Sequence, residues 1–171
     1  MKFIDIIGQE NVKQQLVKSV ENKKLSHALM FLGSEGNGAL ALAIAFAQYI
    51  NCENKTSGDS CGECPSCTKS NKYVHPDIHF SFPVIKKEKN PPISLDYIKE
   101  WRAALLENPY LSYMDWLNFM DFENKQANIT IDECHSIIKT LSLKAFEGNY
   151  KIVIMWLPEF LGKSGNTLLK I

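Results

Sequence analysis

Four cysteines close together constrain the fold of this chain more than any other feature. Cys52, Cys61, Cys64 and Cys67 follow the spacing C-x8-C-x2-C-x2-C. Two short turns that share Cys64, with a fourth thiol from the preceding segment, are typical of a tetrahedral zinc site, because thiolates are preferred zinc ligands. Since four protein ligands leave no coordination position open, we expect the Zn²⁺ to be structural.

Other interpretations of these cysteines stay open, namely free thiols, an oxidised pair or an iron–sulfur cluster. The chain lacks the C-x2-C-x2-C-x3-C-P run of bacterial iron–sulfur proteins. Its N-terminus has no apolar signal segment, which predicts a cytoplasmic protein whose thiols remain reduced. The fifth cysteine, Cys134, is expected to be a buried thiol in a helix.

A glycine-rich turn follows a short apolar run at 26–32. Its residues are Gly33, Ser34, Glu35, Gly36, Asn37 and Gly38. A working phosphate-binding loop continues with Lys, which reaches the phosphates, and with Ser or Thr, which binds magnesium. Here Ala39 and Leu40 take those two positions. We therefore expect no ATP hydrolysis and no bound nucleotide, while a plain strand-to-helix turn is an equally good interpretation of the glycines.

A second nucleotide feature is absent from the best strand of the chain, 151–156. A P-loop protein carries its magnesium-binding acid at the end of the corresponding strand. This chain has Trp156 and Leu157 there, and we expect Glu159, after Pro158, to lie on the surface.

Hydrophobic periodicity predicts alternating strands and helices, and so an α/β fold with a parallel sheet. Expected helices are 9–21, 39–50 (largely buried), 94–106, one after 129–132 and one from about Gly165. Expected strands are 26–32 (buried), 78–84 and 151–156. An aromatic-rich insertion at 86–128 begins with a lysine-rich connector.

Composition excludes several classes of protein. At 45% hydrophobic and 22% charged residues the chain is neither disordered nor fibrous. It has no apolar run of the roughly 20 residues that span a bilayer. Nineteen basic residues balance nineteen acidic ones, so no net field attracts nucleic acid. We expect the three tryptophans to fill the core or a subunit interface, and His27 to be packed or hydrogen-bonded. His75 or His79 would be at most a spare metal ligand.

Several ordered motifs resemble one protein family. They are Asp5 to Glu10, Ser26 to Gly33, the four cysteines, His75-Pro76-Asp77 and Asn166 to Lys170. Together they resemble the delta-prime subunits of the bacterial DNA polymerase III clamp loader and, more distantly, the gamma/tau subunits. The resemblance covers both ends of the chain and is weakest over the aromatic insertion.

The resemblance implies an AAA+ P-loop-like domain: a parallel sheet with flanking helices and a zinc module inserted at 52–67. It implies a non-hydrolysing subunit in a hetero-pentameric ring with delta and gamma/tau subunits, which places the sliding clamp on primed DNA. Residues 1–171 would be an N-terminal fragment with an incomplete sheet, ending before the arginine-finger motif. Arg102, the single arginine, matches no such motif.

Two other functions are weighed against this one. An ATP-hydrolysing gamma/tau-like subunit would require the missing Lys and Ser or Thr after Gly38. A zinc module that binds nucleic acid alone would need basic residues, but the cysteine segment carries Glu53, Asp59 and Glu63 against Lys55.

Overall fold

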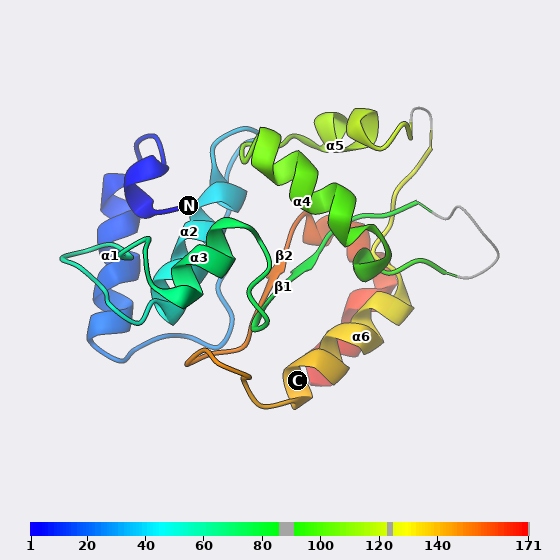
Figure 1. The fold of residues 1–171 in the computed structure, drawn as a ribbon. Helices are drawn as coiled ribbons and strands as arrows, with labels where there is room; N and C mark the ends of the chain where they lie inside the picture. The colour runs from blue at the N-terminus through cyan, green and yellow to red at the C-terminus, as the bar shows by residue number, and fades with distance from the viewer. Residues whose placement is uncertain (86–90, 123–124, 171) are drawn as a thin grey trace.

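The computed structural model describes residues 1–85, 91–122 and 125–170 (Figure 1). Its helices are α1 (Glu10–Glu21), α2 (Ala39–Asn51), α3 (Pro65–Asn71), α4 (Ile98–Glu107), α5 (Tyr113–Phe119) and α6 (Ile131–Ser142). The strands are β1 (Ile78–Ser81) and β2 (Ile152–Met155), and 3₁₀ segments span Phe3–Asp5, Ser94–Tyr97 and Pro158–Lys170. No helix within these described ranges is long and apolar enough to cross a membrane.

The two strands form a parallel sheet in which Ile78 pairs with Ile152 and Ser81 with Met155. Both strands were expected, and both are shorter than the sequence pattern indicated. β1 ends at Ser81, and Pro83 has no N–H with which to continue the pairing with β2. The Ser94 hydroxyl bonds the N–H and the C=O of Phe82, at 2.9 and 3.1 Å, on the other edge of β1. The fold is mixed α/β, as expected.

The prediction of a buried strand at 26–32 is wrong. This segment belongs to neither strand, and Met30 and Leu32 are 80% and 87% exposed. A strand needs a hydrogen-bonded neighbour, and in the described residues no other strand lies against this segment. His27 is exposed as well, so it is not packed in a core.

Helix α2 is buried along almost its whole length, as its apolar sequence predicted. One part of its surface packs with α1 and the N-terminal turn, around Phe3, Leu16 and Phe46. Another part faces the core that covers the sheet. Because α2 is held from two sides, its ends are fixed, and these ends carry the glycine loop and the first cysteine.

Aromatic side chains stack within the main core, among aliphatic ones. Trp101 of α4 stacks on Phe82, with ring centroids 4.1 Å apart, and Trp116 of α5 meets both rings edge-on at 5.2 Å. All three of these side chains are fully buried. The aromatic-rich insertion thus contributes side chains to the core, among them Trp116 and Phe122, which are both buried. Positions 86–90 and 123–124 of the insertion lie outside the described residues.

The C-terminal segment differs from its expected form. A helix was expected from about Gly165, but 3₁₀ turns begin at Pro158 and are interrupted at Gly162, where φ is 50°. Phe160 of this segment accepts a backbone hydrogen bond from Ile129 (3.1 Å), and α6 packs alongside it. These contacts place α6 beside the strands.

Candidate metal centre and glycine loop

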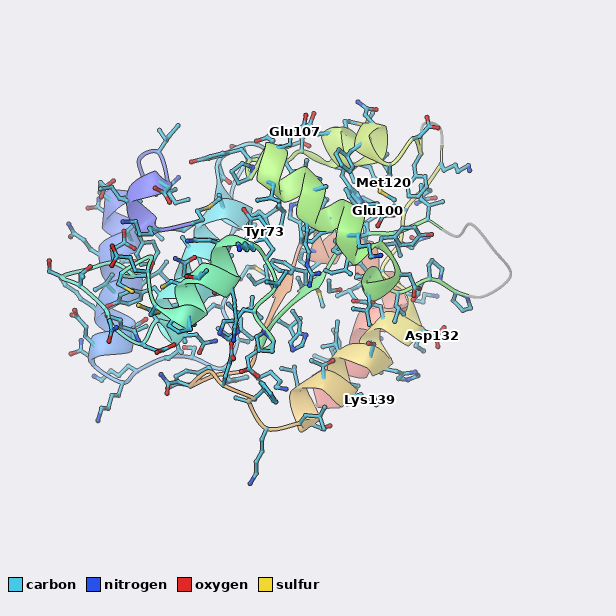
Figure 2. All side chains as sticks on the ribbon, in the orientation of Figure 1. Tyr73, Glu100, Glu107, Met120, Asp132 and Lys139 are labelled. Atoms are coloured by element: carbon cyan, nitrogen blue, oxygen red, sulfur yellow. The ribbon has the colours of Figure 1, made fainter. Side chains whose placement is uncertain are left out.

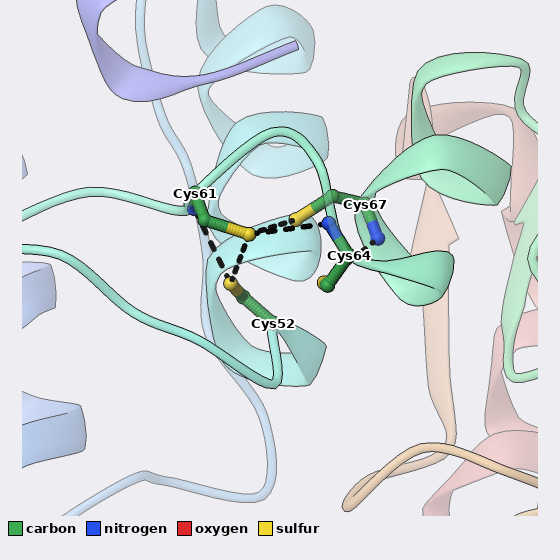
Figure 3. Close-up of side chains that lie close together, drawn as sticks. All are labelled: Cys52, Cys61, Cys64 and Cys67. Carbon is green, nitrogen blue, oxygen red and sulfur yellow. Dashed lines mark hydrogen bonds between the residues drawn. The ribbon is translucent and has the colours of Figure 1, made fainter.

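The four cysteines come together at the junction of α2 and α3 (Figure 3). Cys52 follows the last residue of α2, Cys61 and Cys64 lie on the intervening turn, and Cys67 is on the first turn of α3. Their four Sγ atoms lie within 4.8 Å of one another. Cys52, Cys64 and Cys67 are buried, while Cys61 is partly exposed.

The local sequence explains how the thiols converge. Backbone N–H groups donate to the sulfurs: Cys61 to Cys52 at 3.3 Å, Cys64 to Cys61 at 3.3 Å, and Cys67 to Cys64 at 3.4 Å. Pro65 is the first residue of α3, where a helix does not need a backbone N–H donor. Cys64 caps this helix, because its sulfur accepts the N–H of Cys67. The tight turn between the pairs contains Gly62 at φ 82°.

The thiol distances fit a zinc ion. Tetrahedral coordination at the usual Zn–S distance puts sulfur atoms about 3.8 Å apart. The Sγ of Cys61 lies 3.6 Å from that of Cys52 and 3.9 Å from that of Cys67. Four thiolates also match the donor set that this metal prefers. The four clustered cysteines could therefore hold a metal ion such as zinc.

The pKa values of the thiols differ across the cluster. Burial raises the pKa of the Cys52 and Cys67 thiols. Hydrogen bonds from the N–H groups of Cys64 and Glu63 lower the pKa of Cys61 to about 6. The Cys61 thiol therefore ionises more readily than the two buried thiols, whose ionised form a bound cation would favour.

The cysteine segment is tied to the N-terminus through Asp59. Its carboxylate accepts hydrogen bonds from the N–H groups of Phe3 (2.9 Å) and Ile4 (3.0 Å). Asp59 is also one of the acidic residues that make this segment a poor binding site for nucleic acid. His75 and His79, considered as spare ligands, do not belong to the cluster that the described residues form.

The glycine loop, Gly33 to Gly38, leads directly into α2. Gly38 adopts φ 84°, and a Cβ there would lie 2.8 Å from the Tyr110 ring. The Asn37 side chain folds over Gly33, and its Oδ1 accepts the N–H of Ala39 at 3.0 Å. Asn37 thus satisfies an amide that a phosphate-binding loop presents to its ligand, and Tyr110 lies against Gly38.

The two residues that follow β2 are Trp156 and Leu157. Trp156 is buried in the core, where its ring lies 5.2 Å from that of Trp101. Glu159 is exposed, as expected. Cys134 is buried in α6 and lies outside the cysteine cluster, also as expected.

Asp77 is the residue of greatest structural consequence that periodicity did not reveal. Its fully buried carboxylate accepts three backbone N–H groups, from Phe146 (2.7 Å), Glu147 (2.8 Å) and Gly148 (2.8 Å). Lys151 lies 3.8 Å away. The only signal in the sequence was its place in the His75-Pro76-Asp77 motif.

His75 extends this network to the cysteine segment. Its Nδ1 accepts the N–H of Asp77 (3.1 Å), so its Nε2 carries the proton and donates to the Ser66 hydroxyl (3.0 Å). Burial lowers the pKa of His75, which keeps the ring neutral near pH 7. Ser66 lies between two of the cysteines, so the network links the cluster to the segment that enters β2.

These features define a class of protein: a mixed α/β chain with a four-cysteine cluster between two helices and a glycine loop at the start of its buried helix. A family model described as DNA polymerase III, delta subunit, matches residues 8–171. The chain therefore belongs to this family of DNA polymerase III subunits.

Curated relatives are subunits of the same polymerase. Subunit tau of Bacillus subtilis is 38% identical over 66 residues, which are 39% of this chain and 12% of the relative. Subunit gamma/tau of Mycoplasma pneumoniae is 29% identical over 136 residues, or 80% and 17%. Subunit gamma/tau of Mycobacterium tuberculosis strain H37Rv is 32% identical over 110 residues, or 64% and 18%. The chain thus spans less than a fifth of the length of these relatives.

Proposed function

We propose that this chain is a non-hydrolysing clamp-loader subunit of the delta-prime type, acting in DNA replication. In this role it would join delta and gamma/tau subunits in a hetero-pentameric ring that places the sliding clamp on primed DNA. Membership of the family and similarity to gamma/tau subunits support the clamp-loader assignment. The glycine loop supports the delta-prime type.

The proposal of the delta-prime type over an ATP-hydrolysing subunit rests on the residues of the glycine loop, where a P-loop protein binds nucleotide. Ala39 and Leu40 provide neither the cation nor the hydroxyl of a phosphate-binding loop. Asn37 lies against Gly33, and Tyr110 lies against Gly38. A subunit that hydrolyses ATP would need this space and the Ala39 amide for phosphate oxygens.

We further propose that residues 1–171 form an N-terminal AAA+ domain portion, with a structural zinc module at 52–67 and an aromatic-rich insertion at 86–128. The cluster of the four thiols supports the zinc module in this division. Zinc would be held by Cys52, Cys61, Cys64 and Cys67 and would supply cross-linking of α2 and α3 rather than catalysis.

Calorimetric titration with Mg²⁺ and a non-hydrolysable ATP analogue tests the nucleotide claim. The chain is expected to show no binding, since the loop presents no cation and its space is filled. A double variant, Ala39→Lys with Leu40→Thr, restores the two missing side chains and serves as the competence control. Micromolar binding by the unaltered chain would contradict the proposal and favour a gamma/tau-like ATPase.

A further inference from the structure

A groove of about 210 Å³ lies between α4 and α6, beside β1 (Figures 1 and 2). Ile78, His79 and Phe80 of β1 all line it. Side chains of consecutive strand residues point to opposite faces, so a groove that touches three in a row must run along the strand's edge. None of the four clustered cysteines and no residue of the glycine loop lines the groove, and the proposed function does not use it.

The edge of β1 that faces this groove has unused backbone groups. Asp77 and Ser81 accept hydrogen bonds from Ile152 and Trp156 of β2, so alternate residues such as Phe80 present their N–H and C=O to the other edge. At the end of β1, Ser94 already satisfies Phe82. Among the described residues nothing bonds the N–H or C=O of Phe80.

The two ends of the groove carry opposite charges. At the start of β1, Arg102 donates its Nε to the Tyr73 carbonyl (2.8 Å) and forms no ion pair with any described residue. At the other end, Glu133 accepts the N–H of Ser94 (2.7 Å). The three strand residues between them span about 10 Å.

The walls between these charges are largely apolar, and one polar atom in them lacks a partner. Leu95, Ile98 and Ile137 of α6 line the groove, together with Val153 of β2, which pairs with His79. His79 lines it too, and its Nε2 is buried without a hydrogen-bond partner among the described residues. An apolar channel with polar groups at its ends and edge suits an extended peptide.

We propose that this groove binds an extended peptide segment of a partner protein, which adds to β1 as a third strand. The segment carries an acidic side chain for Arg102 and a basic side chain for Glu133, three positions apart, with apolar residues between. Unpaired strand edges are templates for such addition, and charge complementarity sets the register. Three positions put the two side chains on opposite faces of the added strand, and α4 and α6 lie on opposite sides of β1 (Figure 1).

The test is an NMR titration of the ¹⁵N-labelled chain with capped tetrapeptides. The probes are Asp-Ile-Val-Lys and Lys-Val-Ile-Asp, which cover both strand directions, with Asn-Ile-Val-Gln and Gln-Val-Ile-Asn as uncharged matches. We expect one charged peptide to shift the Phe80 amide and to bind about tenfold more tightly than its uncharged match. Methylating its central backbone nitrogen should abolish binding, because the added strand then loses a donor.

Variants assign the binding to the groove. Arg102→Gln should remove the tenfold advantage of the charged peptide, while Arg102→Lys should keep most of it. Lys139→Gln, which removes an exposed charge from α6, is the matched control and should change nothing. Thr140→Trp should block the groove physically, and melting curves show whether each variant is folded.

Three results would overturn the proposal: shifts confined to residues outside the groove, equal binding of charged and uncharged peptides, or undiminished binding by Arg102→Gln. Self-association of the chain through the same residues would also overturn it, because the occupant would then be a second copy.

Discussion

Replacing Cys67 by Ser is expected to abolish zinc binding and to unfold the segment between α2 and α3. Cys67 is fully buried, and its sulfur lies 3.9 Å from that of Cys61. The segment has little apolar core besides the cysteines themselves, so metal binding would provide most of its folding free energy. Structural zinc sites contribute roughly 10–16 kcal/mol of apparent binding free energy in small domains.

The measurement is metal content together with far-UV circular dichroism and a melting curve. We expect about one zinc ion per chain in the unaltered protein and none in the variant, with loss of signal from α3. Cys134→Ser is the matched control: it also removes a buried thiol, but from α6, and should leave the zinc in place. A Cys67→Ser chain that keeps its metal, or an unaltered chain whose stability is indifferent to a strong chelator, would contradict the metal centre.

Replacing Asp77 by Asn is expected to cause the second largest loss. The carboxylate is the common acceptor for three amides of the 146–148 segment, and an Asn side chain has one oxygen to offer. Leaving buried donors without acceptors costs about 1–3 kcal/mol each, so the free energy of unfolding should fall by about 3 kcal/mol. β2 begins four residues after this segment, and we expect the sheet to loosen with it.

The contribution of Asp77 to the free energy of unfolding should depend on pH. Burial would raise the pKa of Asp77, but the N–H groups of Gly148, Glu147 and Phe146 and the Lys151 ammonium outweigh it and hold this pKa below its usual value. A carboxyl whose pKa is lower in the folded state stabilises the protein above its unfolded pKa, near 3.8, and loses this contribution as the pH falls further.

Urea unfolding at several pH values checks both claims. The difference between the unaltered chain and Asp77→Asn should be constant from about pH 5 to pH 7 and should shrink below about pH 4. Asp115→Asn is the control, because Asp115 also has a lowered pKa, from hydrogen bonds with Ser112, but lies exposed in the capping box of α5. The free energy of unfolding of Asp115→Asn should fall by about 1 kcal/mol or less. A constant difference down to pH 2 would refute the ionised role of Asp77.

Local patterns in the sequence predicted the parts that local physics decides. The spacing of the four cysteines predicted a cluster, because short turns can bring such thiols together whatever surrounds them. Helix α2 follows from an unbroken run of helix formers, and β2 from β-branched residues. The missing nucleotide side chains at Ala39 and Leu40 are also a property of the sequence alone.

Tertiary structure decided what depends on a distant partner. The apolar run at 26–32 has the composition of a strand, but a strand exists only where another strand bonds it, and composition does not say whether that neighbour is present. Asp77 is 69 residues from the first amide it accepts, and Ser94 is 12 residues from Phe82, whose N–H it accepts only because folding sets the two side by side. The groove beside β1 likewise forms only because α4 and α6 lie near that strand in space, although not in sequence. Hydrophobic periodicity shows which side of an element is apolar, but it does not show which other element will cover that side.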